Sequence, residues 1–404
     1  MMAKPIGPIC NLDCTYCYYL SKKDLFKNDE SWRMPDDVLD EFIHQYIDAQ
    51  QAPLVKFSWQ GGEPTLLGVD FFEKVVKLQK AYCTTGKQIA NDLQTNGTLI
   101  DEKWCEFLAE NGFLVGLSID GPRHLHDKYR LDKNGRSTFD RVVAAARLMT
   151  KHGVEFNTLT VVNRANGKQP LEVYRFLRDE LGSRYMQFIP CVEPKGFAAT
   201  PPQHWDADRL PRLGDAAAHP GNRDSVVTDW SVDPDDFGMF LCAIFDEWHR
   251  RDVGSVFVIL FELAVSVWMG MSSTACTFAE TCGNALAFEH DGTVYSCDHY
   301  VYREFRLGNI NTKSLFDMVH AKRQREFGLD KKRTLPGYCL DCDYLFACNG
   351  ECPKNRFIVT PDGEYGLNYL CSGLKQYFRH VDPQMKQMAA ELRRERSPSI
   401  RWGN

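Results

Sequence analysis

Short apolar runs alternate with amphipathic stretches along the first half of the chain. The apolar, β-branched or aromatic runs lie at 54–59, 113–119, 154–162 and 185–191, with a weaker one at 88–94. The stretches between them space their apolar residues as one face of a helix does, and they cover 36–50, 70–82, 101–111, 137–152 and 170–181. Together with a short opening strand before Cys10, this pattern predicts six successive strand–helix units.

Such a series of units is typical of a parallel sheet curled into a partial barrel, so we expect an α/β fold of the (β/α)6 type. Enzymes built on parallel strands place their chemistry at the carboxyl ends of the strands. Polar motifs fall at those ends here, at 60–64, 94–97 and 118–122. Asp101 and Ser137 stand where the N-caps of two helices are expected.

The chain changes character after residue 193. Residues 194–236 are rich in Pro, Asp, Ala and Gly with little periodicity, which predicts a long surface excursion or linker. A helical pattern resumes over 234–271. The most apolar segment, 256–269, is shorter than the roughly 18 residues that span a bilayer and contains Glu262, so we expect a buried helix there.

Beyond Cys276 the chain consists of short segments punctuated by Gly and Cys, which predicts a small domain organised around metal. A charged helical tail is expected over 383–396. We therefore divide the chain into a barrel domain, 1–232, with its long loop at 194–232, and a helical connector with a cysteine-rich domain, 233–404.

Composition and charge exclude several classes of protein. Hydrophobic residues make up 44% and charged residues 25% of the 404 residues, as in an ordinary globular enzyme. The formal net charge of −6 argues against a nucleic-acid partner, which usually requires a basic stripe. The amino terminus has no apolar core followed by a cleavage site, so we expect no export and no membrane partner.

Fifteen cysteines are the unusual feature of the composition. Three lie at 10–17 and eight between 276 and 371. Four stand alone and are interpreted as small buried hydrophobes: Cys83, Cys105, Cys191 and Cys242. A chain of this size needs no disulfide framework, and clustered thiols in a cytoplasmic protein usually bind metal. We therefore expect a cytoplasmic metalloprotein.

The first cluster, Cys10, Cys14 and Cys17, has the spacing C-x3-C-x2-C on a loop after the first strand. Three thiolates can hold one face of a 4Fe–4S cube, which leaves the fourth iron without a protein ligand. An open metal position is where a cofactor or substrate binds. A zinc site and three incidental cysteines are the alternatives, but structural zinc sites use four ligands and no fourth Cys or His is nearby.

These residues resemble the radical S-adenosylmethionine (SAM) superfamily. Tyr16 precedes the last cysteine of the motif, and the sequence GGEP at 61–64 follows a strand, as the family's glycine-rich motif does. In that family SAM binds the open iron, and one electron cleaves it to a 5′-deoxyadenosyl radical. The resemblance implies the following contacts with SAM: Tyr16, Gly62, Ser118, Arg130 and Val192.

The second group of cysteines contains eight thiolates, the number that two fully ligated 4Fe–4S clusters need. It resembles the SPASM extension of radical SAM enzymes that modify peptides and proteins. The resemblance implies that one auxiliary cluster uses Cys276, Cys282, Cys297 and Cys352. It implies that the other uses Cys339, Cys342, Cys348 and Cys371. Two zinc ribbons are the alternative interpretation.

Longer stretches resemble the anaerobic sulfatase-maturating enzymes across most of the chain. They are CNLDCTYCYYL (10–20), QGGEPTL (60–66), LQTNGTLID (93–101), FLVGLSIDGP (113–122), CDHYV (297–301), RLGNI (306–310) and LNYLC (367–371). Such enzymes convert a Cys or Ser of a sulfatase motif into Cα-formylglycine and release 5′-deoxyadenosine and methionine. The implied cofactors are three 4Fe–4S clusters and SAM.

The same resemblance assigns roles and partners. It places a proton-accepting carboxylate directly after an auxiliary-cluster cysteine, which here is Asp298, and Tyr19 and Gln60 at the wall of the substrate pocket. The implied partners are an unfolded sulfatase polypeptide or peptide and a flavodoxin- or ferredoxin-type reductant. One alternative is a related enzyme that forms thioether or carbon–carbon cross-links, which need not have an acid at 298. Another is a redox or zinc scaffold, which has no use for the GGEP motif or Ser118.

Overall fold

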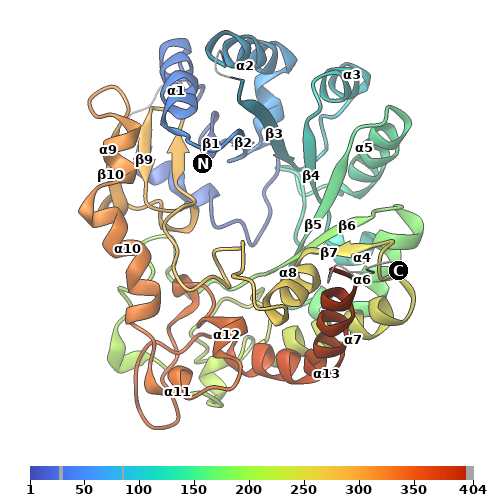
Figure 1. Ribbon diagram of the computed structural model, residues 1–404, viewed down its shortest axis with the longest axis vertical. Helices are drawn as coiled ribbons and strands as arrows, with labels where there is room; N and C mark the ends of the chain where they lie inside the picture. Colours follow the sequence, from blue (N-terminus) through green and yellow to red (C-terminus); the bar gives the residue numbers. More distant parts are fainter. Residues whose placement is uncertain (27–30, 84–85, 397–404) are drawn as a thin grey trace, which may run out of the picture.

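A computed structural model describes residues 1–26, 31–83 and 86–396. Its framework is one ten-stranded sheet in the order β10-β9-β8-β1-β2-β3-β4-β5-β6-β7 (Figure 1). The strands from β8 to β7 in this order are parallel, while β9 and β10 join antiparallel beside β8. The strands are β1 (Met2–Lys4), β2 (Leu54–Trp59), β3 (Gln88–Thr95), β4 (Leu114–Ser118), β5 (Phe156–Val162), β6 (Tyr185–Pro190), β7 (Phe257–Val258), β8 (Ala287–Glu289), β9 (Thr293–Tyr295) and β10 (Arg306–Asn309).

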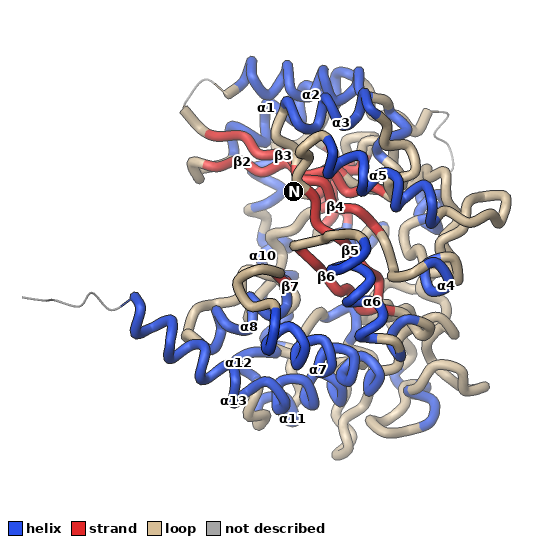
Figure 2. Tube along the Cα trace, turned by 90° about the vertical axis from the view of Figure 1, so that its right-hand side faces the viewer, coloured by secondary structure: helices blue, strands red, loops and turns tan. Residues whose placement is uncertain are grey.

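Helices surround this sheet. Figure 2 shows the strands in the interior, with α1, α2 and α3 packed at one end and α7, α8 and α13 at the opposite end. The α-helices are α1 (Asp36–Ala49), α2 (Val69–Tyr82), α3 (Glu102–Glu110), α4 (Arg123–His126), α5 (Phe139–Lys151), α6 (Pro170–Arg175), α7 (Pro234–Arg251), α8 (Ile259–Trp268), α9 (Leu315–Val319), α10 (Lys322–Arg333), α11 (Gly337–Leu340), α12 (Leu345–Cys348) and α13 (Cys371–Arg396). No helix within the described residues is both long and apolar enough to cross a membrane.

The predicted α/β partial barrel is confirmed. β2 covers the run predicted at 54–59, and the strands and helices predicted up to residue 181 are present with ends shifted by a few residues. Asp101 caps α3 by accepting a hydrogen bond from the backbone N–H of Trp104 at 2.9 Å. Ser137 is not a cap, which corrects the prediction: α5 follows Thr138, and the Ser137 hydroxyl donates instead to Asp127.

Two parts of the second half differ from expectation. The predicted buried helix over 256–269 is divided, because Phe257–Val258 first pair with β6 as strand β7 and only Ile259–Trp268 are helical. The cysteine-rich region also contributes β8, β9 and β10 to the main sheet, where β8 lies beside β1. The two regions therefore share one sheet, and their division at residue 232 stays a prediction.

Residues 194–236 contain short 3-10 turns until α7 begins, as expected of a loop. They are not exposed throughout, since Val227 and Val232 are fully buried. A bridge between Arg212 and Val359 ties the loop to the cysteine-rich region.

The last helix is seated firmly on the scaffold. Gly373, at the start of α13, contacts α7 so closely that a Cβ atom there would lie 1.8 Å from the carbonyl oxygen of Pro234. Glycine is required where two backbones approach to this extent. The contact fixes Cys371, the first residue of α13.

Candidate active site

The loop that carries Cys10, Cys14 and Cys17 leaves the carboxyl end of β1 and lies against the glycine-rich motif. The backbone N–H of Gly62 donates to Gly7 at 2.8 Å, and that of Glu63 donates to Ile9 at the same distance. A Cβ atom on Gly62 would lie 1.8 Å from the carbonyl oxygen of Ile9. The GGEP motif therefore sets the position of the cysteine loop. The resemblance of this motif to the family did not indicate that role.

Substitution of Gly62 by alanine is expected to displace the cysteine loop, because the Ile9 carbonyl cannot remain where it is. We expect SAM binding to the anaerobically reconstituted protein to weaken by roughly tenfold or more, a loss of about 1.4 kcal/mol. Equilibrium dialysis with labelled SAM measures this affinity. An unchanged affinity in a Gly62→Ala protein that holds its clusters would contradict the role of this contact.

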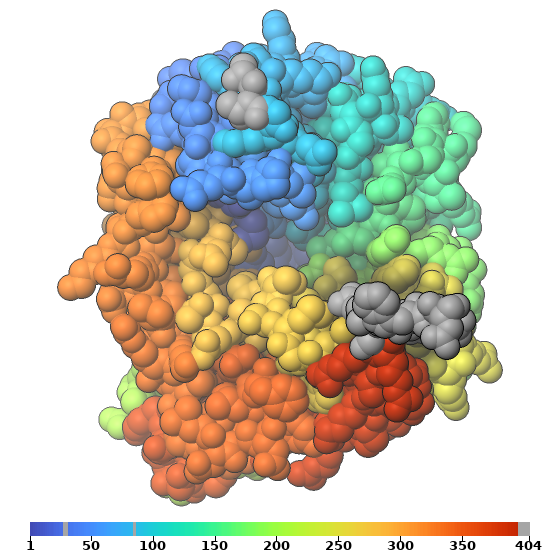
Figure 3. Space-filling model, viewed as in Figure 1, coloured from blue at the N-terminus to red at the C-terminus, as the bar shows by residue number. Residues whose placement is uncertain are grey.

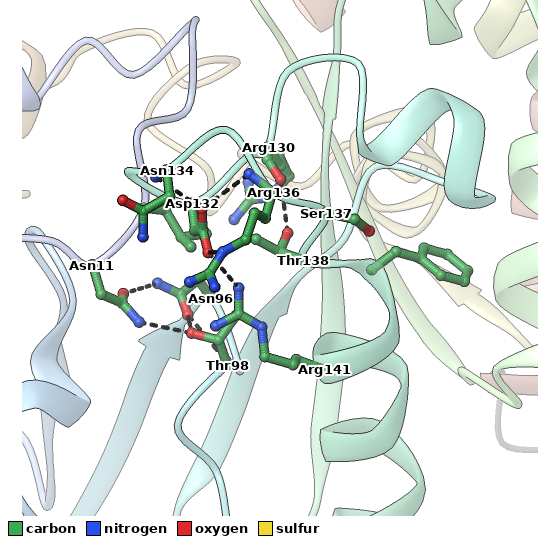
Figure 4. A network of polar contacts seen from close by, with 12 residues as sticks. Asn11, Asn96, Thr98, Arg130, Asp132, Asn134, Arg136, Ser137, Thr138 and Arg141 are labelled. Carbon is green, nitrogen blue, oxygen red and sulfur yellow. Dashed lines mark hydrogen bonds and ion pairs between the residues drawn. The ribbon is translucent and has the colours of Figure 1, made fainter.

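Glu63 of the same motif is a buried acceptor that joins three segments. Its carboxylate accepts from the hydroxyls of Thr65 at 2.6 Å and Thr95 at 2.7 Å, and from the backbone N–H of Asn96 at 2.7 Å. The Asn96 amide in turn lies 3.7 Å from the Sγ of Cys10. It also donates to the Asn11 side chain at 2.8 Å (Figure 4). The ends of β2 and β3 therefore orient the first cysteine.

Tyr16, Asp120 and Arg130 form a buried triad beside this loop. The Tyr16 hydroxyl donates to Asp120 at 2.5 Å and accepts from the Arg130 guanidinium at 2.7 Å. The Nε atom of Arg130 is buried and has no hydrogen-bond partner among the described residues. A buried cation with a free donor fits an anionic ligand such as the carboxylate of SAM. Ser118 is buried at the end of the neighbouring β4.

Val192 is buried just beyond β6. Its carbonyl oxygen accepts a hydrogen bond from Lys354 at 2.8 Å, and Lys354 also lies 3.1 Å from the Glu193 carboxylate. Lys354 follows Cys352 by two residues. The end of β6 is therefore tied directly to the cysteine-rich region.

Four of the later cysteines line a single cavity. They are Cys339, Cys342, Cys348 and Cys371, and Tyr338, Tyr344 and Phe378 complete much of the wall. Burial raises the pKa of the Cys348 and Cys371 thiols, the latter to about 12. A bound metal stabilises the thiolate form and so favours deprotonation of thiols that burial keeps protonated. The structure thus brings together the four residues expected to hold one auxiliary cluster.

The other four cysteines come from three segments that also converge. Cys297 interacts electrostatically with Cys352 and Cys276, and Cys282 with Cys276. No three His, Cys, Asp or Glu side chains in the described ranges lie as close together as a single metal ion requires. A 4Fe–4S cube spreads its thiolates farther apart than one ion does, so both groups of cysteines are compatible with a cube.

Asp298 follows Cys297 and contacts residues of β1 and of the first cysteine loop. Lys4, the last residue of β1, places its Nζ 2.5 Å from one carboxylate oxygen, and the Tyr18 hydroxyl donates to the other. Burial would by itself raise the pKa of Asp298, but Lys4 and His299 outweigh it and lower that pKa to about 2. The carboxylate is therefore ionised at neutral pH and is connected to the first cysteine loop through Tyr18.

The two predicted pocket residues lie nearby. The Tyr19 hydroxyl donates to Glu289 at 2.5 Å, and its ring lies 3.9 Å from the Lys4 ammonium. Gln60 follows β2, and its backbone N–H donates to Ala3 of β1 at 2.9 Å. Figure 3 shows a hollow near the middle of one face, with the first part of the chain (blue) at its floor.

Sequence reasoning missed several polar residues around Asp298. Lys4 could have been found from its place at the end of the first strand, and Tyr18 from its place next to Cys17. Nothing in the sequence indicates Lys22, which is 2% exposed and has no hydrogen-bond partner for its Nζ among the described residues. This ammonium lies 3.3 Å from the centre of the Tyr302 ring, and burial lowers its pKa to about 8.

Comparison with known proteins identifies the family. Residues 5–177 match the Radical SAM superfamily, and residues 276–343 match the SPASM iron-sulfur cluster-binding domain. The chain is 46% identical over 399 residues to a serine-type anaerobic sulfatase-maturating enzyme of Bacteroides thetaiotaomicron, covering 99% of this chain and 93% of that protein. This chain belongs to the anaerobic sulfatase-maturating enzymes. The cysteine and GGEP motifs predicted the radical SAM superfamily and the longer stretches predicted this family, and both predictions are confirmed.

Other members are similar over most of their length. A serine-type enzyme of Klebsiella aerogenes is 34% identical over 97% of this chain and 87% of its own. A cysteine-type enzyme of Clostridium perfringens is 33% identical over 97% of this chain and 99% of its own. The solved structure of native anSMEcpe with bound AdoMet superposes with a TM-score of 0.81 at 34% identity and covers 96% of this chain and 98% of that one.

Proposed function

We propose that the protein oxidises a Ser or Cys side chain of a sulfatase polypeptide to Cα-formylglycine, with release of 5′-deoxyadenosine and methionine. Membership of the sulfatase-maturating family supports this proposal, as do the serine-type and cysteine-type names of its relatives. The observation that carries it is the hydrogen bond from Tyr18 to Asp298. It joins the loop of the first cysteine cluster to a carboxylate beside an auxiliary-cluster cysteine.

The residues fit three 4Fe–4S clusters and SAM. Cys10, Cys14 and Cys17 would hold the first cluster. The two groups of four cysteines described above would hold the auxiliary clusters. The residues that would contact SAM are Tyr16, Gly62, Ser118, Arg130 and Val192. When bound, these cofactors supply the 5′-deoxyadenosyl radical that removes a hydrogen atom from the target Cβ. No disulfide joins any two cysteines in the described part of the chain, which supports a reducing location such as the cytoplasm.

The polar residues of the site act on the target residue. The carbon radical left by the hydrogen abstraction would pass its remaining electron to an auxiliary cluster, while Asp298 accepts the proton of the target hydroxyl or thiol, because its carboxylate is ionised and buried. A serine target then gives the aldehyde directly, and a cysteine target gives a thioaldehyde that water hydrolyses with release of sulfide. Lys4 and Tyr18 hold the carboxylate in place, while Tyr19 and Gln60 bound the pocket. A flavodoxin- or ferredoxin-type protein supplies the electrons.

An isotope experiment tests this function. Two matched peptides with the motif S-x-P-x-R or C-x-P-x-R, deuterated at the target Cβ, are incubated with reductant and SAM. We expect the mass change of aldehyde formation and deuterium in 5′-deoxyadenosine. The 46% identity to a serine-type enzyme leads us to expect turnover of the serine peptide. Deuterium transfer from Cα instead, or a cross-linked product, would identify the other class of peptide-modifying enzyme.

A further inference from the structure

A strained turn joins the two auxiliary-cluster sites. Cys348 belongs to one group of cysteines and Cys352 to the other, and the three residues between them all have positive φ. The values are 47° for Asn349, 68° for Gly350 and 47° for Glu351. Residues other than glycine rarely adopt this conformation. The surrounding structure must therefore hold the turn in place.

Arg356 holds it together with Asn368, whose amide donates to the Gly350 carbonyl and the Glu351 carboxylate. The arginine side chain is 6% exposed, and its guanidinium donates to the carbonyl oxygens of Gly350 at 3.0 Å and Asn349 at 3.1 Å. It also donates to the carbonyl of Lys331 at 2.6 Å. A Cβ atom on Gly350 would lie 2.6 Å from this guanidinium. A side chain at position 350 would therefore clash with Arg356, and glycine avoids that clash. The planar fork of donors suits several carbonyls at once.

The turn and its neighbours also reach the loops of both cysteine groups. The Asn349 amide donates to the carbonyl of Phe278, between Cys276 and Cys282, at 2.8 Å. Lys331, whose carbonyl Arg356 holds, donates from its ammonium to the carbonyl of Cys276 at 2.5 Å. A single buried arginine is thus linked to segments that present cysteines to both clusters.

The position of the charge matters as well as the hydrogen bonds. Arg356 interacts electrostatically with Cys339 of one group and with Cys352 of the other. An arginine remains charged in proteins, and charges interact strongly in a buried environment. Reduction adds an electron to a cluster, and net charge is among the factors that set its potential. A fixed cation that interacts with cysteines of both groups would favour reduction of both clusters.

We propose that Arg356 is a positioning residue that assembles the two auxiliary clusters together and raises both of their reduction potentials. The inference rests on the auxiliary clusters of the proposed function. It goes beyond that function because it assigns one side chain to both clusters. Electron acceptance after the hydrogen abstraction would then depend on a residue that ligates no iron.

Three variants test the proposal by iron content and redox titration followed by electron paramagnetic resonance. Arg356→Gln removes the charge, Arg356→Lys keeps it with fewer donors, and Arg333→Gln is a control because Arg333 is half exposed and pairs with Glu326 on the same helix. We expect Arg356→Gln either to lose both auxiliary clusters, leaving about four irons, or to keep them and lower both potentials. The lowering should reach about tenfold in the reduction equilibrium, or about 59 mV for one electron.

The remaining outcomes are also decisive. Arg356→Lys should keep both potentials near those of the unchanged protein but release iron from both clusters faster to a chelator. Loss of one auxiliary cluster alone, in either variant, would overturn the proposal. So would full iron content with unchanged potentials in Arg356→Gln. If the unchanged protein itself held only about four irons, the auxiliary clusters of the proposed function would be wrong, which is a separate failure.

Discussion

Replacing Cys10, Cys14 and Cys17 together by alanine is expected to abolish the reductive cleavage of SAM. These thiols are the three ligands that leave one iron open, and no other cysteine lies in the same loop. Eleven cluster thiolates should hold about twelve irons in three clusters, so the triple variant should retain about eight. Iron and sulfide analysis after anaerobic purification measures the loss, and chromatography of 5′-deoxyadenosine measures the activity.

A lone cysteine provides the control for this experiment. Cys242 lies half-buried on α7, outside all three groups, and Cys242→Ala should keep about twelve irons and full cleavage of SAM. The triple variant should still bind its auxiliary clusters, because their cysteines come from separate segments. Formation of 5′-deoxyadenosine by the triple variant would show that the catalytic cluster lies elsewhere.

The parts of the fold that the sequence predicted are those with local signals. The run at 54–59 is bounded by turn residues and packs alternate side chains into the core, so its strand is evident from the chain alone. β8 and β9 have three residues each, and β8 pairs with β1, which lies more than two thirds of the chain away. A pairing so short and so distant leaves no periodicity along the chain, so the sequence predicts a separate domain there.

The residues of the site also divide into those with a local sequence signal and those without one. The cysteine spacings predicted which thiols bind metal, since a cube imposes spacing on a local loop. Asp298 was predicted through its neighbour Cys297 and a family resemblance. Its partners Lys4 and Tyr18 lie at the other end of the chain, and only the folded sheet brings them together. Lys22 gave no signal because an isolated lysine is usually a solvated surface residue.

Substitution of Asp298 by asparagine is expected to separate radical formation from product formation. Asparagine still accepts a hydrogen bond from Tyr18 but cannot take up the proton of the target residue. The three clusters do not involve this side chain, so cleavage of SAM should continue. Formylglycine output should fall by about 10²–10⁴-fold, the usual contribution of a general base. Mass spectrometry of the peptide and chromatography of 5′-deoxyadenosine give the ratio of the two products.

The buried ion pair dictates the controls for this variant. Asp298→Asn leaves the Lys4 ammonium buried without its counter-charge, which destabilises a protein whatever its catalytic role. The double variant Lys4→Met/Asp298→Asn removes that charge. If Asp298→Asn and the double variant both keep their full iron content and both lose formylglycine output, the loss reflects the missing base. Asp246→Asn, on α7 beside His380, tests the substitution at an aspartate outside the site and should leave both products unchanged. Normal aldehyde yield from either Asp298 variant with about twelve irons would exclude Asp298 as the proton acceptor.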